Sequence, residues 1–199
     1  MNKDDLVFEE SLNYNELVAY LLAKYGVAKY SYFCKDNCKS KQKKNMRTNE
    51  GLFLHHIEEK NHIMLCNPMF AKQWNFEETQ SATKLVYCNY LEHLLLHIKI
   101  TNEYMENAIA KTKESTGIGG VVNFIGPELS TYYAEPPVGC WQQAMFEIVK
   151  DNYDDYIRII AEFEVAHPEF DLSKNIEGRR IKKIRKDIDK VKKETAIKA

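Results

Sequence analysis

Histidine is concentrated in one part of this chain. Five of the six histidines, at positions 55, 56, 62, 93 and 97, fall within 43 residues. Two are adjacent, as His55-His56, and two are four residues apart, as His93-x-x-x-His97. Imidazole binds divalent metal ions and, when neutral, takes a proton from water near pH 7. A fold that brings the two pairs together can form a metal site with a general base beside it. If the chain has such a site, its fold must place these two segments side by side.

The residues around these histidines predict two strands and a helix. Residues 51–57 are mostly apolar with polar borders, and residues 84–88 are β-branched and aromatic, so both segments are expected to be strands. Asn89 is a favourable N-cap residue, and Glu92 can reach back to its backbone N–H in a capping box. Residues four apart lie on one side of a helix, so the two histidines of the following helix project together.

Helices are also predicted before and after this central part. The expected helices span residues 13–25, 89 to about 113, 141–166 and 174–199, the last being amphipathic. Residues 62–66 are assigned to a short strand, and the glycine- and proline-rich residues 115–139 to turns. The sequence therefore predicts an α+β fold that is mostly helical, with a small ββα element near its middle.

Composition limits the classes of protein. A chain of 199 residues with 44% hydrophobic and 29% charged residues has the size and composition of one globular domain. It contains no apolar run of 18 residues, so no membrane span is predicted. The N-terminus lacks the apolar segment of a signal peptide, and the five cysteines are odd in number. Both observations favour reduced thiols and a cytoplasmic protein.

Positive charge is concentrated in two segments. Residues 35–47 hold six basic side chains and one acidic one, and residues 174–199 hold eleven basic and four acidic ones. Lysine and arginine supply most of the nonspecific affinity of proteins for nucleic acids. Both segments are therefore candidate surfaces for a nucleic-acid backbone, with a solvated loop as the alternative for residues 35–47. The candidate contacts are Lys41, Lys43, Lys44, Arg47, Arg179 and Arg180.

The order of these features resembles a known family. A tandem His-His, a second strand and a helix with His-x-x-x-His are similar to the ββα-metal motif of the HNH endonuclease (His-Me finger) superfamily, over residues 51–100. The resemblance implies a central ββα-metal element with flanking helices, which hydrolyses phosphodiester bonds with one divalent cation. The expected segments are an N-terminal helix and basic loop at 1–50, the nuclease core at 51–113 and a C-terminal helical region with a basic tail at 114–199.

The resemblance assigns roles to individual residues. It implies that His56 is the general base that activates water, and that the metal ligands are His55, His93 and His97. Lys84 stands where the family has an asparagine that braces the hairpin. A lysine cannot accept a hydrogen bond, and we hypothesise that it faces phosphate instead. Glu58 is a candidate for orienting the base or a metal-bound water, with a surface carboxylate as the alternative, so Lys84 and Glu58 join His56 as candidate catalytic residues.

The predicted activity is metal-dependent cleavage of DNA. Double-stranded DNA is the expected partner and Mg2+ the expected ion, with Mn2+, Ni2+ and Zn2+ as alternatives, and the choice of DNA rests on the resemblance alone. Two rival classes are left open. One is a protein of the same fold that binds nucleic acid without cleaving it. The other is a helical interaction module, in which the histidines belong to the core or to a structural zinc site. Its C-terminal helix pairs through Ile184 and Ile188 with a partner or with a second copy of the chain.

Four of the cysteines raise a further alternative, a structural zinc site. These are Cys34, Cys38, Cys66 and Cys88. Structural zinc sites commonly use closely spaced pairs of cysteines, and only one near-pair is present here. We therefore favour buried free thiols, which behave as small hydrophobic groups.

Overall fold

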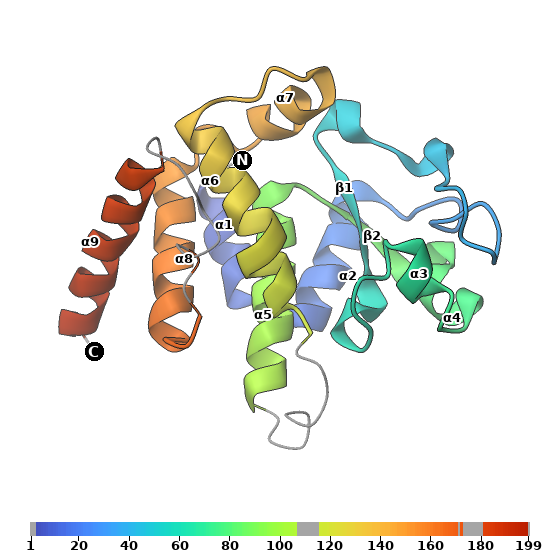
Figure 1. Ribbon diagram of the computed structural model, residues 1–199, viewed down its shortest axis with the longest axis horizontal. Helices are drawn as coiled ribbons and strands as arrows, with labels where there is room; N and C mark the ends of the chain where they lie inside the picture. Colours follow the sequence, from blue (N-terminus) through green and yellow to red (C-terminus); the bar gives the residue numbers. More distant parts are fainter. Residues whose placement is uncertain (1–2, 107–115, 171, 173–180, 199) are drawn as a thin grey trace.

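The computed structural model describes residues 3–106, 116–170, 172 and 181–198 (Figure 1). The helices of these residues are α1 (Lys3–Ser11), α2 (Tyr14–Tyr25), α3 (Pro68–Ala71), α4 (Phe76–Gln80), α5 (Tyr90–Glu106), α6 (Gly126–Ala134), α7 (Cys140–Glu147), α8 (Tyr153–Ala166) and α9 (Lys182–Lys198). Four short 3₁₀ turns, η1 (Lys43–Asn45), η2 (Thr48–Glu50), η3 (Ile57–Lys60) and η4 (Ala82–Lys84), and a π-helical segment, η6 (Gly120–Ile125), join them. With the two strands below, the predicted α+β, mostly helical class is confirmed.

A two-stranded antiparallel sheet lies at the centre of the chain. Strand β1 (Phe53–His56) pairs with β2 (Leu85–Cys88), so that His55 faces Val86 and His56 faces Leu85 across the ladder. Successive side chains of a strand point to opposite faces, so the tandem histidines are directed to the two sides of the sheet. The strand predictions for residues 51–57 and 84–88 are confirmed, with each observed strand lying within its predicted range.

The start of α5 is fixed by its cap. The Asn89 side chain accepts from the backbone N–H groups of Leu91 and Glu92, and Glu92 Oε2 accepts from the Asn89 N–H at 2.7 Å. The predicted capping box is therefore confirmed. Because α5 starts two residues after β2, its first turns lie close to the sheet, and the rings of His93 and His97 pack against that of His55 in β1.

One main hydrophobic core draws on all three of the expected segments. It includes Leu17 of α2, Leu94 of α5 and Ile160 of α8. Helix α9 packs against α8 (Figure 1), and its Ile184 and Ile188 are buried in this core. The apolar stripe that was a candidate oligomer surface is thus covered by the chain's own α8. No helix of the described residues is long and apolar enough to cross a membrane.

Several predicted elements differ from the structure. Residues 62–66 form turns instead of a strand, with Met64 in the left-handed region at φ 54°. Residues 120–134 are helical in η6 and α6, because the apolar side chains of Val121, Ile125 and Leu129 recur every four residues and are buried. The single helix predicted for 141–166 is two helices, α7 and α8, and α1 was not predicted. The expected extension of α5 to about 113 lies outside the described residues.

Candidate metal centre

Three histidines from two elements converge beside the sheet. His55 comes from β1, and His93 and His97 come from successive turns of α5. One ring nitrogen of each lies within 4.8 Å of those of the other two, and the rings lie edge-on or tilted at centroid separations of 4.9 to 5.2 Å. The predicted metal-binding residues are thus brought together, and three converging imidazoles fit a divalent metal ion.

The ring of His55 is oriented by Tyr14 of α2. The Tyr14 hydroxyl donates to the carbonyl oxygen of Ile57 at 2.8 Å and lies 3.2 Å from His55 Nε2. Because its only proton goes to Ile57, the hydroxyl accepts from His55 Nε2–H, and the lone pair of the neutral ring is on Nδ1. His55 Nδ1 is buried and has no hydrogen-bond partner among the described residues. A metal ligand whose second nitrogen is held by a neighbour has this arrangement.

The ring of His97 is oriented by the segment that follows α5 in the described chain. His97 Nδ1 lies 3.1 Å from the carbonyl oxygen of Gly117, which can only accept, so Nδ1 carries a proton. The lone pair of a neutral His97 is therefore on Nε2. Gly120 packs directly against this ring, since a Cβ atom at Gly120 would lie 2.2 Å from His97 Nδ1.

A carboxylate that the sequence analysis did not select faces these nitrogens. Glu59 Oε2 lies 3.3 Å from His97 Nε2 and 3.4 Å from His55 Nδ1. Burial alone would raise the pKa of the Glu59 carboxyl, but the hydrogen bond with His97 and the neighbouring imidazoles outweigh it and hold the pKa well below its usual range. Glu59 is therefore an anion within the histidine cluster.

The turn η3 explains why Glu59 occupies this place. A 3₁₀ turn has three residues per turn, so side chains three apart are eclipsed. Glu59 lies three residues after His56 and lines up with it, whereas Glu58 is rotated away. The spacing His56-x-x-Glu59 was visible in the sequence, but only a helical turn directly after the strand gives it meaning.

His56 lies on the other side of Glu59 from the three-histidine cluster. Its Nε2 is 3.0 Å from Gln80 Oε1, while the Gln80 amide nitrogen donates to the Leu65 carbonyl, so Nε2 carries the proton. The lone pair on His56 Nδ1 faces Glu59 Oε1 at 3.9 Å. Burial lowers the pKa of His56 below 6.5, so the ring is neutral at pH 7. A neutral imidazole with one free nitrogen is equipped to accept a proton.

Burial also keeps two of the candidate ligands neutral. It lowers the pKa of His55 to about 3 and that of His93 well below 6.5, with the neighbouring histidines acting in the same direction. Metal ions bind the neutral form of imidazole. His93 Nδ1 is buried without a hydrogen-bond partner among the described residues. These two rings therefore offer lone pairs to an ion at any pH near neutrality.

The other two candidate catalytic residues contact each other. Lys84 Nζ donates to Glu58 Oε1 at 2.8 Å, and Glu58 also accepts from the Asn61 side chain. This ion pair joins the residue before β2 to the turn after β1. Among the described residues, Lys84 and Glu58 form no hydrogen bond or ion pair with the clustered histidines.

The candidate nucleic-acid contacts occupy different environments. Lys43 and Lys44 are exposed, whereas Arg47 binds Glu50 through two hydrogen bonds and donates to the Tyr25 carbonyl. Lys41 lies over the Tyr32 ring, 5.2 Å from its centroid, and that ring packs 4.3 Å from the ring of His56. Lys41 is thus the member of the set that the structure links to the histidines. Arg179 and Arg180 lie outside the described residues.

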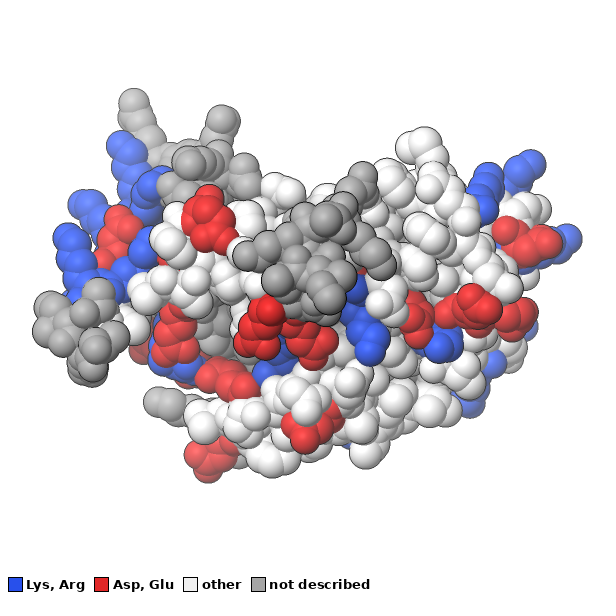
Figure 2. Space-filling view, turned by 90° about the horizontal axis from the view of Figure 1, so that it is seen from below, with Lys and Arg blue, Asp and Glu red and all other residues white. Residues whose placement is uncertain are grey.

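The two basic segments lie far apart. The loop at 35–47 and α9 are at opposite ends of the long axis of the molecule (Figure 1). In Figure 2, Lys and Arg side chains gather at the end that holds α9 and again at the opposite end, with acidic and basic side chains interspersed between them. A nucleic acid that contacted both segments would have to span the longest dimension of the protein.

The cysteines do not form a second centre. All five thiols are free, Cys38 and Cys88 are buried, and Cys34, Cys66 and Cys140 are exposed. Among the described residues, which include every cysteine, the histidine cluster is the group whose ligand atoms converge. The four cysteines that were expected to be free are free, and Cys38 and Cys88 are buried as expected, whereas Cys34 and Cys66 are exposed.

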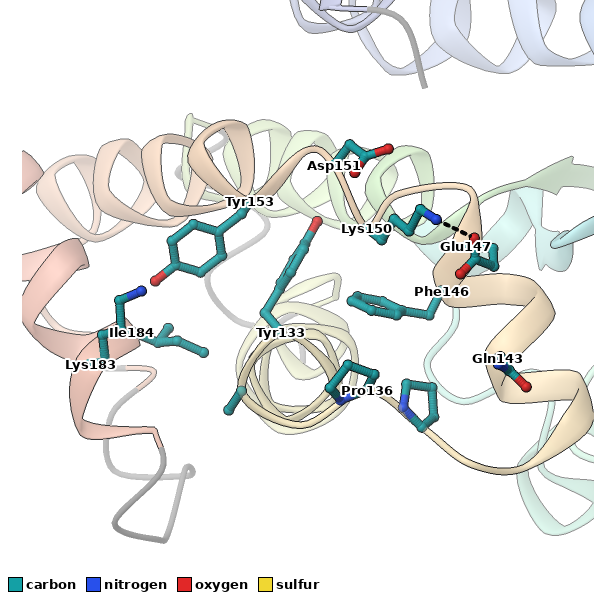
Figure 3. A pocket seen from close by; sticks show the side chains of 12 residues that line it. Tyr133, Pro136, Gln143, Phe146, Glu147, Lys150, Asp151, Tyr153, Lys183 and Ile184 are labelled. Atoms are coloured by element: carbon teal, nitrogen blue, oxygen red, sulfur yellow. Dashed lines mark ion pairs between the residues drawn. The ribbon is translucent and has the colours of Figure 1, made fainter.

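A separate cleft lies between α6, α7, α8 and α9 (Figure 3). It has a volume of about 530 Å³ and is lined by aromatic rings, including Tyr133, Phe146 and Tyr153, with one Lys150–Glu147 ion pair at its edge. It contains none of the histidines. Among the described residues, the side chains that could bind a metal ion converge at the histidine cluster and not in this cleft.

Comparison with known proteins adds no relative. No family model, no curated protein and no solved structure matches this chain significantly. The function must therefore be argued from the site itself.

Proposed function

We propose that this chain is a metal-dependent endonuclease of the HNH type that hydrolyses phosphodiester bonds in DNA. One observation carries the proposal. Three imidazole nitrogens converge, and a fourth histidine, His56, is held with its unprotonated nitrogen facing Glu59, the carboxylate that His55 also faces. Hydrolysis of a phosphodiester needs a base for water and positive charge for the phosphate, and this pairing offers both.

Each residue has a distinct role in this proposal. His56 Nδ1 takes the proton of the attacking water, while Gln80 keeps the opposite nitrogen protonated. His55, His93 and His97 hold a divalent cation, which supplies positive charge for the phosphate and the leaving oxygen. Lys41 lies over Tyr32, which packs on His56, so Lys41 is the basic side chain that we assign to the phosphate beside the base. The proposed substrate is double-stranded DNA, and the proposed location of the protein is the cytoplasm.

Cleavage of supercoiled plasmid tests the proposal. Purified protein is incubated with plasmid and Mg2+, Mn2+, Ni2+ or Zn2+, beside His56→Ala and the control His62→Ala, whose ring packs on Trp74 instead of entering the cluster. We expect metal-dependent nicking that His56→Ala abolishes and His62→Ala retains, with equal metal binding by all three proteins. Absence of cleavage with every metal would favour the rival that binds nucleic acid without cutting it.

A further inference from the structure

The contacts of Glu59 indicate that the metal centre includes more than the three histidines. This inference rests on the proposed function. We propose that Glu59 is a fourth protein ligand, that a substrate phosphate adds as a fifth ligand, and that the centre binds Zn2+ or another first-row transition metal ion in preference to Mg2+. The Glu59 carboxylate lies against two of the three histidines, and it belongs to neither of the histidine motifs from which the metal site was predicted.

The first argument is a count of donors and acceptors. The lone pairs of neutral His55 and His97 are on Nδ1 and Nε2, as their bonds to Tyr14 and Gly117 require. Both of these atoms face Glu59 Oε2, which is itself an acceptor when ionised. Without a metal ion, His97 can hydrogen-bond Glu59 only through a second ring proton, on Nε2, and buried His55 Nδ1 still has no hydrogen-bond partner among the described residues. A metal ion placed between the three atoms contacts all of them.

The second argument is distance. Two ligands at about 2.0–2.1 Å from a tetrahedral ion are separated by roughly 3.3–3.4 Å. Glu59 Oε2 lies 3.3 Å from His97 Nε2 and 3.4 Å from His55 Nδ1. The carboxylate oxygen therefore already stands at the spacing of a ligand pair. The histidine nitrogens, within 4.8 Å of one another, come to this spacing by small side-chain rotations.

The donor set selects the class of ion. Mg2+ prefers an octahedron of oxygen ligands, whereas imidazole suits zinc, copper, iron and nickel. Three imidazole nitrogens and one carboxylate oxygen thus favour a transition metal ion. The second oxygen of Glu59 faces His56 Nδ1, so one side chain joins the metal centre to the base.

Metal binding by three proteins tests the inference without recourse to cleavage. Wild type, Glu59→Gln and Glu58→Gln are titrated with Zn2+ against a chromophoric chelator, and with Co2+ while visible absorption is recorded. Glu58→Gln is a matched control, because it is the adjacent carboxylate of the same turn but pairs with Lys84. Circular dichroism of the three metal-free proteins shows whether each is folded.

We expect Glu59→Gln to weaken Zn2+ binding by about tenfold or more and to change the Co2+ spectrum. Glu58→Gln should keep the Zn2+ affinity within about twofold of wild type and leave the Co2+ spectrum unchanged. Millimolar Mg2+ should not displace Co2+ from wild type. Wild-type affinity and an unchanged spectrum in folded Glu59→Gln, or displacement of Co2+ by Mg2+, would overturn the inference. If Glu59 proves to be a ligand while wild type cuts no plasmid, the proposed function fails and the ligand set stands.

Discussion

At the scale of single residues, hydrogen bonds that lead away from the centre decide what each histidine can do. Tyr14, Gly117 and Gln80 each take one ring proton, from His55, His97 and His56 respectively. In each case the remaining lone pair faces Glu59. Partners of this kind fix the tautomer and orientation of a ring, so they belong to the site as much as the histidines do.

Gln80→Leu tests this dependence for the base. The substitution removes the acceptor for His56 Nε2–H, so the ring loses its fixed tautomer, and we expect plasmid cleavage to slow by about 10- to 100-fold with unchanged metal affinity. Gln73→Leu, at an exposed position in the turn after α3, is the control. An unaltered rate in Gln80→Leu would exclude this orienting role.

The lowered pKa of His56 also predicts how plasmid cleavage depends on pH. Because burial lowers this pKa below 6.5, the cleavage rate of wild type should fall only in acid, as pH drops through the lowered pKa, and should be level near pH 7.

Lys84→Met separates a structural from a catalytic role of this lysine. The Lys84–Glu58 pair is partly exposed, and such pairs contribute about 0.2–1 kcal/mol. We therefore expect a loss of less than about 1 kcal/mol in the free energy of unfolding, measured by urea denaturation, and cleavage within about threefold of wild type. A fall of about a hundredfold in cleavage at normal stability would instead place Lys84 on the substrate.

The histidines could be selected from the sequence, but Glu59 could not. The pairs His55-His56 and His93-x-x-x-His97 have spacings that a strand and a helix turn into shared directions. Glu59 becomes their neighbour only because β1 ends in the 3₁₀ turn η3, and the same residues in an open turn would have sent it elsewhere. Glu58 was selected because it is two positions after His56, but in a 3₁₀ turn the side chain three positions after His56 is the one aligned with it.

At the scale of elements, predictions succeeded where local chemistry fixes the structure. The capping box of Asn89 and Glu92 sets the start of α5, and it can be read from four residues. Residues 120–134 were expected to be turns because glycine and proline usually interrupt helices. Here Gly126 and Pro127 are at the start of α6, where proline is tolerated, and tertiary burial of the apolar side chains decides the outcome.

Gly120→Ala tests the contact between η6 and α5. A methyl group at this position would overlap the ring of His97, whose other side faces Glu59, so the ring must move. We expect the affinity for Zn2+ or Co2+ to fall by about tenfold or more. Gly119→Ala is a matched control, because the nearest atom to its added methyl is Asn123 Nδ2 at 3.9 Å. Equal affinities of the two variants would show that His97 is not a ligand or can relocate freely.

At the scale of the whole molecule, α9 completes the core of the chain. Replacing buried isoleucine by alanine typically costs about 2–5 kcal/mol. Ile184→Ala should therefore lower the free energy of unfolding by about 2 kcal/mol or more, as measured with urea, whereas Lys186→Ala on the exposed side of α9 should change it little. Light scattering should give the same molar mass for all three proteins. A smaller mass for folded Ile184→Ala would restore the oligomer that the sequence left open.

A buried charge cluster ties the N-terminal helices to α5. Lys24 of α2 donates to Glu9 of α1 at 2.7 Å and to Glu92 of α5 at 2.8 Å, and Tyr25 donates to the same oxygen of Glu92. Glu92 thereby serves the capping box and the cluster at once. Burial, together with the adjacent Glu92 carboxylate, raises the pKa of Glu9 from 4.5 to about 7. One lysine therefore serves two carboxylates at the junction of three helices.

The raised pKa makes stability depend on pH in a defined direction. The folded protein binds the Glu9 proton more tightly than the unfolded chain, so this contribution to stability is complete below pH 4.5 and is lost as pH rises through 7. Glu9→Gln cannot ionise and escapes the loss. We expect the difference in unfolding free energy, variant minus wild type, to increase between pH 5 and pH 8 by up to about 3 kcal/mol. The titration of the histidines, present in both proteins, cancels in this difference. A difference that does not vary with pH would mean that Glu9 stays ionised in the fold and that Lys24 alone neutralises both carboxylates.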